Sequence, residues 1–235
     1  MYLVLFDCDG TLVDSQHIIV AAMQRAFEAN NIEPLPASAV LSIVGLSLPL
    51  AVERLLPEAE PHTVARVTES YRDAFGVLRR DPAHHEPLYP GMLEIIHDLS
   101  ARPDVLLGVA TGKSIRGVNA LFERMQLAPH FATIQTADTN PSKPHPAMIQ
   151  TALVETGTVP ERTVMIGDTT FDVEMARLAS VGALGVSWGY HPTAALTAAG
   201  AHSIADDAET LHASILGHLG LGARPSKSQE KHRES

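Results

Sequence analysis

The sequence predicts an α/β protein with a doubly wound parallel sheet and an inserted block of helices. The chain opens with a short strand, 2–6, that is apolar throughout, as a strand covered on both faces should be. Beyond Gly91, short apolar runs alternate with segments of helical periodicity. Strands separated by helices imply right-handed crossovers and a parallel sheet with helices on both faces. Between these two parts, residues 37–80 show helical patterns without a convincing strand.

The individual elements follow from hydrophobic spacing and from the residues that end each run. The first helix follows Ser15, a suitable N-cap, and ends before Asn30 and the prolines beyond it. The expected strands are 2–6, 105–110, 131–135, 163–166, 183–186 and 202–204. The expected helices are 18–27, 40–44, 48–56, 64–78, 92–100, 115–125, 147–156, 173–180 and a last one ending at 216.

The order of these elements predicts two domains. Because the first strand belongs to the later sheet, residues 1–15 and 88–220 are expected to form a Rossmann-like core. Residues 16–87 are expected to form a helical cap inserted after the first strand. The tail, 221–235, ends in a polar run and is expected to be disordered.

Composition and residue spacing argue against several classes of function and of binding partner. A formal charge of −10, with no basic run before the tail, argues against nucleic acid as a partner. The single cysteine, Cys8, excludes an internal disulfide framework and fits a reducing compartment. No signal peptide is visible and no apolar run approaches the roughly 18 residues of a membrane helix. A soluble, cytoplasmic protein without membrane contact is expected, and no histidine or cysteine spacing indicates zinc.

Polar side chains gather where the expected strands end. In an open parallel sheet, ligands bind at the carboxyl ends of the strands. The polar residues that follow strands are Asp7, Asp9, Thr111, Gly112, Lys143 and Asp168. Two carboxylates two residues apart at the end of a buried strand cost several kcal/mol unless a cation or a reaction uses them. The sequence therefore predicts a site at this edge of the sheet.

Each of these residues has a simpler interpretation when taken alone. Thr111–Gly112 is typical of a turn, and Lys143 of a solvated loop. Asp168 can cap a helix, and Asp172 is an acid of the kind favoured in a first helical turn. Their joint occurrence along one edge favours a functional site over independent structural roles.

Four motifs in order resemble the haloacid dehalogenase superfamily of phosphoryl-transfer enzymes. They are Asp-Cys-Asp-Gly-Thr-Leu-Val-Asp-Ser at 7–15, Thr-Gly-Lys at 111–113, Ser-Lys-Pro-His-Pro at 142–146 and Gly-Asp-Thr-Thr-Phe-Asp at 167–172. The resemblance covers residues 1–216 and is strongest to the phosphoglycolate phosphatase-like members, whose helical cap follows the first motif. It implies a magnesium-dependent phosphatase that acts on a small phosphorylated metabolite.

The resemblance assigns the central roles to the first motif. Asp7 is the implied nucleophile, which attacks phosphorus and forms an aspartyl-phosphate. Asp9 is the implied general acid and then the base that activates water. Mg²⁺ is expected among the Asp7 carboxylate, the Asp9 backbone carbonyl and Asp168.

The remaining motifs supply the implied phosphate contacts. Thr111, the Gly112 amide and Lys143 are expected to bind phosphate oxygens and offset their charge. Asp172 is expected to act indirectly, through a metal-bound water or through Lys143.

Substrate choice is expected to lie with the cap. The turn containing Gly45 corresponds to the loop that meets the substrate in similar capped enzymes, and Lys113 could face the same cleft. Arg54 is a candidate for binding a second anionic group, although a solvated helix arginine is an equally good interpretation. The leading substrate is 2-phosphoglycolate, and both a monomer and a dimer remain open.

Three other functions stay open at this point. A beta-phosphoglucomutase-like phosphotransferase is disfavoured by Thr11 and by Ile19, where mutases tend to carry a cap histidine. A pyrophosphatase of the same superfamily is a further alternative. A phosphoaspartate signalling module of the receiver type also uses acids, a threonine and a lysine, but it has no cap insertion and carries its acceptor on a middle strand.

Overall fold

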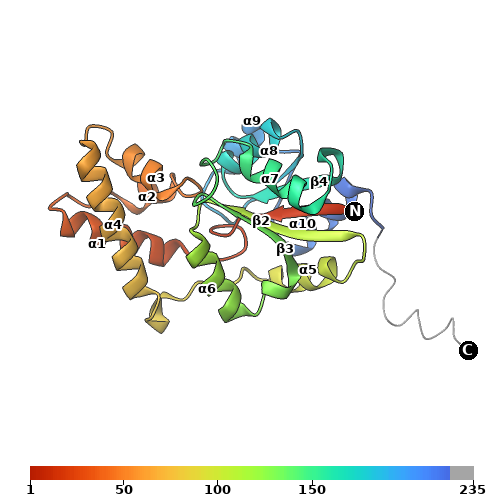
Figure 1. The fold of residues 1–235 in the computed structure, drawn as a ribbon, viewed down its shortest axis with the longest axis horizontal. Helices are drawn as coiled ribbons and strands as arrows, with labels where there is room; N and C mark the ends of the chain where they lie inside the picture. Colours follow the sequence, from red (N-terminus) through yellow and green to blue (C-terminus); the bar gives the residue numbers. More distant parts are fainter. Residues whose placement is uncertain (223–235) are drawn as a thin grey trace, which may run out of the picture.

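The computed structural model describes residues 1–222 and contains one parallel sheet with strand order β3-β2-β1-β4-β5-β6 (Figure 1). The strands are β1 (Tyr2–Phe6), β2 (Val105–Thr111), β3 (Phe131–Thr136), β4 (Thr163–Gly167), β5 (Gly182–Val186) and β6 (Ser203–Ala205). All pairs in the sheet are parallel. The predicted α/β fold class is confirmed.

The helices divide into an inserted group and a group that covers the sheet. The inserted helices are α1 (Gln16–Ala29), α2 (Ala37–Leu41), α3 (Leu48–Leu55) and α4 (Pro61–Leu78). The sheet is accompanied by α5 (Met92–Ser100), α6 (Ile115–Met125), α7 (Ala147–Thr156), α8 (Thr170–Leu178), α9 (Thr193–Ala199) and α10 (Ala208–Leu219). Single turns of 3₁₀ helix lie at η1 (Pro82–His84), η2 (Ala128–His130) and η3 (Pro160–Arg162).

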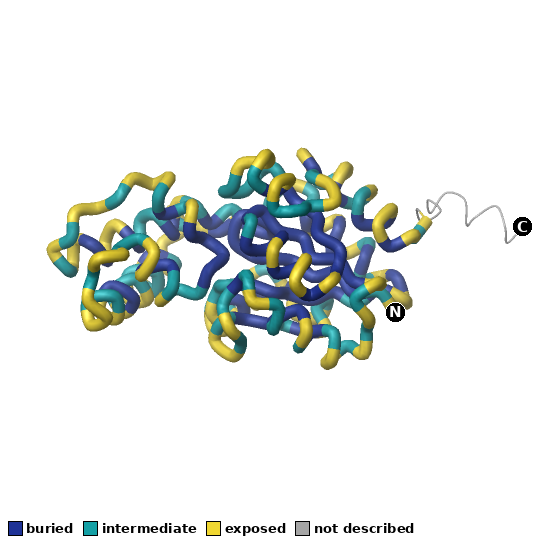
Figure 2. The backbone as a smooth tube through the Cα atoms, turned by 90° about the horizontal axis from the view of Figure 1, so that it is seen from above, coloured by how far each residue is buried: buried dark blue, intermediate teal, exposed yellow. Residues whose placement is uncertain are grey.

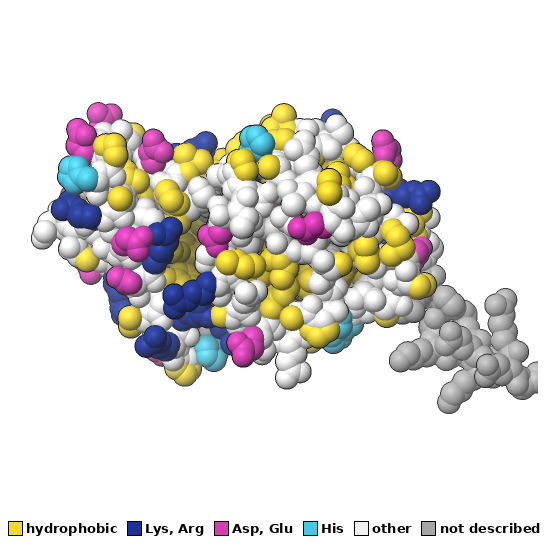
Figure 3. Space-filling model, viewed as in Figure 1, with side chains coloured by type: hydrophobic (Ala, Val, Ile, Leu, Met, Phe, Trp, Pro, Cys, Tyr) yellow, Lys and Arg dark blue, Asp and Glu magenta, His cyan; other side chains and the backbone are white. Residues whose placement is uncertain are grey.

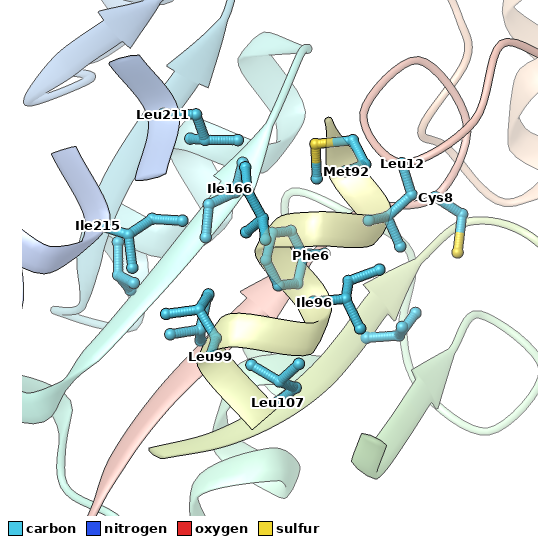
Figure 4. Packing of buried hydrophobic residues seen from close by; sticks show 14 of the residues in the cluster. Phe6, Cys8, Leu12, Met92, Ile96, Leu99, Leu107, Ile166, Leu211 and Ile215 are labelled. Atoms are coloured by element: carbon cyan, nitrogen blue, oxygen red, sulfur yellow. The ribbon is translucent and has the colours of Figure 1, made fainter. Parts of the chain in front are cut away.

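Strand alternation determines which face each side chain of β1 covers. Val4 and Phe6 pack with α5, α6 and α10 on one face (Figure 4), whereas Leu3 and Leu5 pack with α7, α8 and α9 on the other. Cys8 lies fully buried in the first of these clusters, so its thiol points away from the acids on either side of it. The buried backbone is concentrated in the sheet between these layers (Figure 2).

The inserted helices form a separate group beyond one end of the sheet, at the left of Figure 1, and have an apolar cluster of their own. Phe27 of α1, Val52 of α3 and Val67 of α4 are fully buried within it. The expected division into core and cap remains a proposal, taken up below.

Several helices differ from expectation. The helix expected at 40–44 lies at Ala37–Leu41, and the one expected at 64–78 begins at Pro61. The helix α9, Thr193–Ala199, was not expected. The helix expected at 173–180 begins three residues earlier, at Thr170, because Thr169 and Asp172 form a reciprocal capping box. The first helix follows Ser15 as expected, but the Ser15 hydroxyl meets the hydroxyl of Tyr190 instead of capping the helix.

The end of the described chain is attached to the core. Leu221 packs against the first sheet cluster, and Arg102 donates to the carbonyl of Gly222. The rest of the tail expected to be disordered, 223–235, lies outside the described residues. Within residues 1–222, no helix is both long and apolar enough to cross a membrane.

An ion-pair cluster joins α5 to α10 and generates a stability prediction. Asp98 accepts from Arg102 and meets His212 at 2.9 Å. Burial alone would raise the pKa of Asp98, but Arg102 and His212 outweigh it and hold that pKa below its ordinary value. Asp98 therefore contributes stability above a pH of about 4, and the contribution is lost as the pH falls through its folded-state pKa.

Asp98→Asn should lower the free energy of unfolding by about 1 kcal/mol at pH 7, measured by urea denaturation. The difference from wild type should shrink as the pH falls below about 4. Asp104→Asn, at an exposed position nearby, is the matched control and should change little. If the loss in free energy of unfolding were the same in acid as at neutral pH, the stabilisation would not come from the charge of Asp98.

Candidate active site

The candidate site lies where the strand order reverses direction. From β1 the chain crosses to β2 and β3 on one side, and β4 then lies on the other side of β1. Asp7 follows β1 and Asp168 follows β4, so both carboxylates lie at the junction of the two adjacent strands. A crevice at such a junction is where open parallel sheets bind ligands.

Asp7, Asp168 and Asp172 form a buried acidic cluster. One carboxylate oxygen from each lies within 4.8 Å of the others, and each residue is at most 1% exposed. Burial raises the pKa of Asp7 to about 6, against the lowering effect of Lys143. Burial, together with Asp172 and Asp7, also raises the pKa of Asp168 well above its ordinary value. Such a cluster favours the arrival of a cation.

Lys143 is the cation that the chain itself supplies. Its side chain is fully buried, with Nζ 2.5 Å from Asp172 Oδ1 and 3.0 Å from Asp7 Oδ1. Burial alone would lower the pKa of Lys143, but Asp172 and Asp7 raise it above its usual range. Three ionised carboxylates and one ammonium leave two negative charges, which is the charge that a divalent cation neutralises.

Asp7 is the member of the cluster that lacks hydrogen bonds. Its ion-pair distance to Lys143 is short, but neither of its buried oxygens has a well-oriented hydrogen-bond partner among the described residues. By contrast, Asp172 is fixed by the Thr169 amide and hydroxyl, both of which donate to its Oδ2. The oxygens of Asp7 are therefore available to a metal ion or a reacting group, which is the fit expected of a metal site.

Asp168 is held by a loop that the sequence interpretation overlooked. Thr11 donates to its Oδ1 at 2.8 Å, and the Tyr190 amide donates to its Oδ2 at 2.9 Å. A Cβ at Gly189 would lie 2.1 Å from the Cβ of Asp168, so only glycine allows this close approach. The signal was present in Ser-Trp-Gly-Tyr-His at 187–191, a polar run that follows a predicted strand.

Thr111 and Gly112 occupy the adjacent strand end. Thr111 is buried at the end of β2, and its hydroxyl accepts from the Lys113 amide. A Cβ at Gly112 would lie 2.6 Å from the carbonyl oxygen of Gly45 and 2.5 Å from that of Leu46, so the turn between α2 and α3 lies directly on this glycine. The segment between α2 and α3 thus covers this end of the site.

Lys113 lies beside Asp9. Its Nζ is 2.8 Å from Asp9 Oδ1 and 2.6 Å from Glu86 Oε1, and all three side chains are largely buried. Burial alone would lower the pKa of Lys113, but Asp9 and Glu86 raise it above its usual range. The Asp9 side chain lies outside the acidic cluster, and the contribution expected of its backbone carbonyl stays a prediction.

A cavity of about 600 Å³ joins these groups to the inserted helices. Its lining includes Asp7, Asp9, Gly45, Thr111, Gly112 and Lys113, together with the arginines Arg72, Arg79 and Arg116. Figure 3 shows basic side chains gathered around an apolar hollow near the junction of α4 and α6. Arg54 does not line this cavity, because its guanidinium lies over the ring of Phe171.

Comparison with known proteins identifies the family. A model of the haloacid dehalogenase-like hydrolases matches residues 4–186. The chain belongs to this family. The relative named "Probable phosphatase IndB" from Dickeya dadantii is 34% identical, over 95% of this chain and 97% of its own. The phosphoglycolate phosphatase of Rhodospirillum rubrum is 32% identical, over 96% and 97% respectively.

Solved structures agree with this assignment. The structure titled a predicted phosphatase from Clostridium acetobutylicum matches with a TM-score of 0.82 at 26% identity, over 92% of this chain and 99% of that chain. A hydrolase from Pseudomonas syringae matches with a TM-score of 0.77 at 26% identity, over 94% and 98%. The resemblance drawn from the four motifs is confirmed, and the chain is a haloacid dehalogenase-like hydrolase.

The close packing of this hydrolase around Asp168 can be tested at Gly10. Its φ is +85°, and a Cβ there would lie 2.3 Å from Asp168 Oδ2. Gly157 also has a positive φ, +64°, but a Cβ there would meet nothing within 4 Å. Gly157→Ala should cost about 1–2 kcal/mol from backbone strain alone. Gly10→Ala should cost about 1–3 kcal/mol more, by urea unfolding in EDTA. If both substitutions lowered the free energy of unfolding equally, the Asp168 side chain would be able to move aside without strain, which would contradict the close packing.

Proposed function

We propose that this hydrolase is a Mg²⁺-dependent phosphatase that cleaves a small phosphate monoester through an aspartyl-phosphate. The observation that carries the proposal is Asp7, a buried carboxylate without hydrogen bonds that lines the cavity beside Thr111. The next side chain on the same side of the backbone, Asp9, reaches the same cavity two residues later. The relatives named phosphatase and phosphoglycolate phosphatase support this reaction class.

In the first half of the reaction, Asp7 attacks phosphorus and the bond to the leaving-group oxygen breaks. Asp9 gives its proton to that oxygen, so that an alcohol leaves. In the second half, Asp9 takes a proton from water as the water oxygen attacks phosphorus. The bond from phosphorus to Asp7 then breaks, which releases phosphate and restores the Asp7 carboxylate.

The remaining residues hold the phosphoryl group and its charge. Thr111 and Gly112 line the cavity, which supports a role for the Thr111 hydroxyl and the Gly112 amide as donors to phosphate oxygens. Lys143, held between Asp7 and Asp172, offsets the charge that these acids and the phosphate bring together. Asp172 acts by orienting Lys143.

Asp7, Asp168 and the Asp9 backbone carbonyl are the groups proposed to hold Mg²⁺, which prefers hard oxygen ligands. When bound, the ion reduces repulsion between the attacking carboxylate and the phosphate and stabilises charge on the phosphoryl oxygens. The excess negative charge and the lack of hydrogen bonds to Asp7 fit this role.

The proposal includes two domains, a core of residues 1–15 and 88–220 and a cap of residues 16–87. Both contribute residues to the lining of the cavity. The core supplies the acids, and the cap supplies Gly45 and α4. Closure of the cap over Gly112 excludes water from the reacting groups, and opening releases product. The cap thereby limits which leaving groups fit.

2-Phosphoglycolate is the leading substrate because the cavity carries unpaired positive charge. Arg79 at the end of α4 and Arg116 in α6 line it and form no ion pair within residues 1–222. Either guanidinium can accept a carboxylate bidentately. A cavity of about 600 Å³ also admits larger esters, so sugar phosphates and nucleoside monophosphates belong in any comparison.

Asp7→Asn should reduce phosphate release from the best substrate by at least about a thousandfold, because the amide cannot serve as the nucleophile. The measurement is phosphate release with Mg²⁺ across a panel containing 2-phosphoglycolate, sugar phosphates, nucleoside monophosphates and pyrophosphate. Asp206→Asn, at an exposed core position, is the control. Retained activity in Asp7→Asn would refute the nucleophile, and a phosphoryl adduct that persists without turnover would favour a signalling module.

Asp168→Asn should weaken Mg²⁺ binding by about tenfold or more, measured by isothermal titration calorimetry on the metal-free protein. The reason is that the amide removes a negative charge from the proposed ligand set. The same Asp206→Asn variant should bind Mg²⁺ as the wild type does. Unchanged affinity in Asp168→Asn would place the ion elsewhere.

A further inference from the structure

Lys113 connects Asp9 to the segment by which the chain returns from the inserted helices. Lys113 follows the end of β2, and its ammonium lies between Asp9 Oδ1 at 2.8 Å and Glu86 Oε1 at 2.6 Å. The side chains of Lys113 and Glu86 are only 7% and 5% exposed. A buried lysine between two carboxylates is costly to rearrange, since removing one partner leaves the other charge unpaired.

Glu86 falls within the proposed cap range, 16–87, but the hydrogen bonds and ion pairs it makes within residues 1–222 are to Lys113 and Arg124 of the core. Arg124 of α6 donates to the Glu86 carbonyl at 3.0 Å, and its guanidinium also lies 3.9 Å from Oε2. One residue later, the carbonyl of Pro87 accepts from the Asp14 amide. The return segment is therefore fixed to the core from Glu86 onward, and Lys113 is held from the core side. From the inserted helices, Lys113 meets the ring of Phe75, 5.2 Å from its centroid.

This arrangement uses one oxygen of Asp9 and leaves the other free. Lys113 binds Oδ1, whereas Oδ2 has no hydrogen-bond partner among residues 1–222. Asp9 lines the cavity, and its side chain keeps 12% of its surface exposed. A carboxylate fixed through one oxygen presents the other in a defined direction, which is what efficient proton transfer requires.

We propose that Lys113 is a positioning residue for proton transfer, and that Glu86 in turn holds Lys113. This inference rests on the phosphatase reaction proposed above. Asp9 Oδ2 carries the proton that goes to the leaving-group oxygen as the phosphorus–oxygen bond breaks. The same oxygen then receives a proton from the attacking water, so protons balance over the two steps. Lys113 touches neither the substrate nor the phosphoryl group.

The charges around Lys113 distinguish this role from substrate binding. Its ammonium has three donors, two of which already face Asp9 and Glu86. Lys143 instead contacts Asp7 Oδ1 at 3.0 Å, and in the proposed reaction it is the lysine that offsets the phosphoryl charge. If Lys113 positions Asp9, its replacement should lower kcat/KM most for substrates whose leaving group needs a proton. A substrate-binding lysine should affect all phosphate esters alike.

Lys113→Met should therefore discriminate between two kinds of leaving group. p-Nitrophenyl phosphate releases a stable phenolate without protonation, whereas an alkyl phosphate accepted by the wild type needs the proton. For the alkyl ester, kcat/KM should fall at least about a hundredfold, and for p-nitrophenyl phosphate less than about tenfold. Stopped-flow measurements should show a rapid burst of about one p-nitrophenolate per protein followed by slow turnover, because hydrolysis of the aspartyl-phosphate also needs Asp9.

Matched variants separate this role from a loss of structure. Asp9→Asn should reproduce the pattern, and adding Lys113→Met to it should cost little more, since both changes remove one function. Arg80→Met, just after α4 and exposed, should behave as the wild type. If Lys113→Met does not fold, K113M/E86Q avoids leaving Glu86 unpaired and should show the same dependence on the leaving group.

Two results would overturn the inference. One is an equal fall for both esters with a raised KM and no burst, which would make Lys113 a substrate-binding residue. The other is a full additional loss in the Asp9→Asn background. A wild type that releases phosphate from no ester of the panel described above would instead refute the phosphatase function, and this inference with it.

Discussion

The structure depends on the burial of more negative charge than the chain neutralises. Asp7, Asp168 and Asp172 lie within 4.8 Å of one another at the junction of β1 and β4, with Lys143 as the buried cation between two of them. Separating these acids would relieve the repulsion, but the surrounding backbone prevents it. Gly10 and Gly189 bring the chain into contact with Asp168, and the capping box of α8 holds Asp172. Burial without full compensation is what makes Asp7 available to a cation, and it is the basis for proposing Asp7 as the nucleophile.

The fold could be predicted because its signals are local. The apolar run of β1 and the alternation of strands and helices beyond Gly91 are visible in single stretches of sequence. The handedness of the crossovers then limits the possible topologies. Local patterns missed the helix start at Thr170, where Thr169 and Asp172 satisfy the first turn reciprocally. They also missed the short helix α9, Thr193–Ala199, whose seven residues bury only Leu196 fully.

Part of the candidate site was predictable from where the strands end. Asp7 and Asp168 directly follow strands and Thr111 ends one, so the topology alone brings them to one edge of the sheet. Lys143 and Asp172 were expected from the motif resemblance, and they lie together beside Asp7. Lys113 and Glu86 are 27 positions apart in the sequence, and neither lies in a strand or a helix. Arg54 shows the converse, because helical spacing did not reveal that its guanidinium would lie on Phe171. Tertiary packing decides such contacts, and periodicity carries no information about them.

The two ends of the candidate site are held in place by different parts of the chain. The acids, Lys143 and the pair of Lys113 and Glu86 take their ion pairs from residues outside α1–α4, so the proposed proton transfer does not require the inserted helices to be in one position. The proposed phosphate end differs, because the turn at Gly45 lies on Gly112 and covers it. In the proposed reaction, movement of the helices would therefore change access to the phosphate and the space for the leaving group. The direction of Asp9 would be preserved, because Glu86 and Lys113 remain with the core. Reaction chemistry and substrate choice can then vary independently in this architecture, because they depend on different parts of the chain.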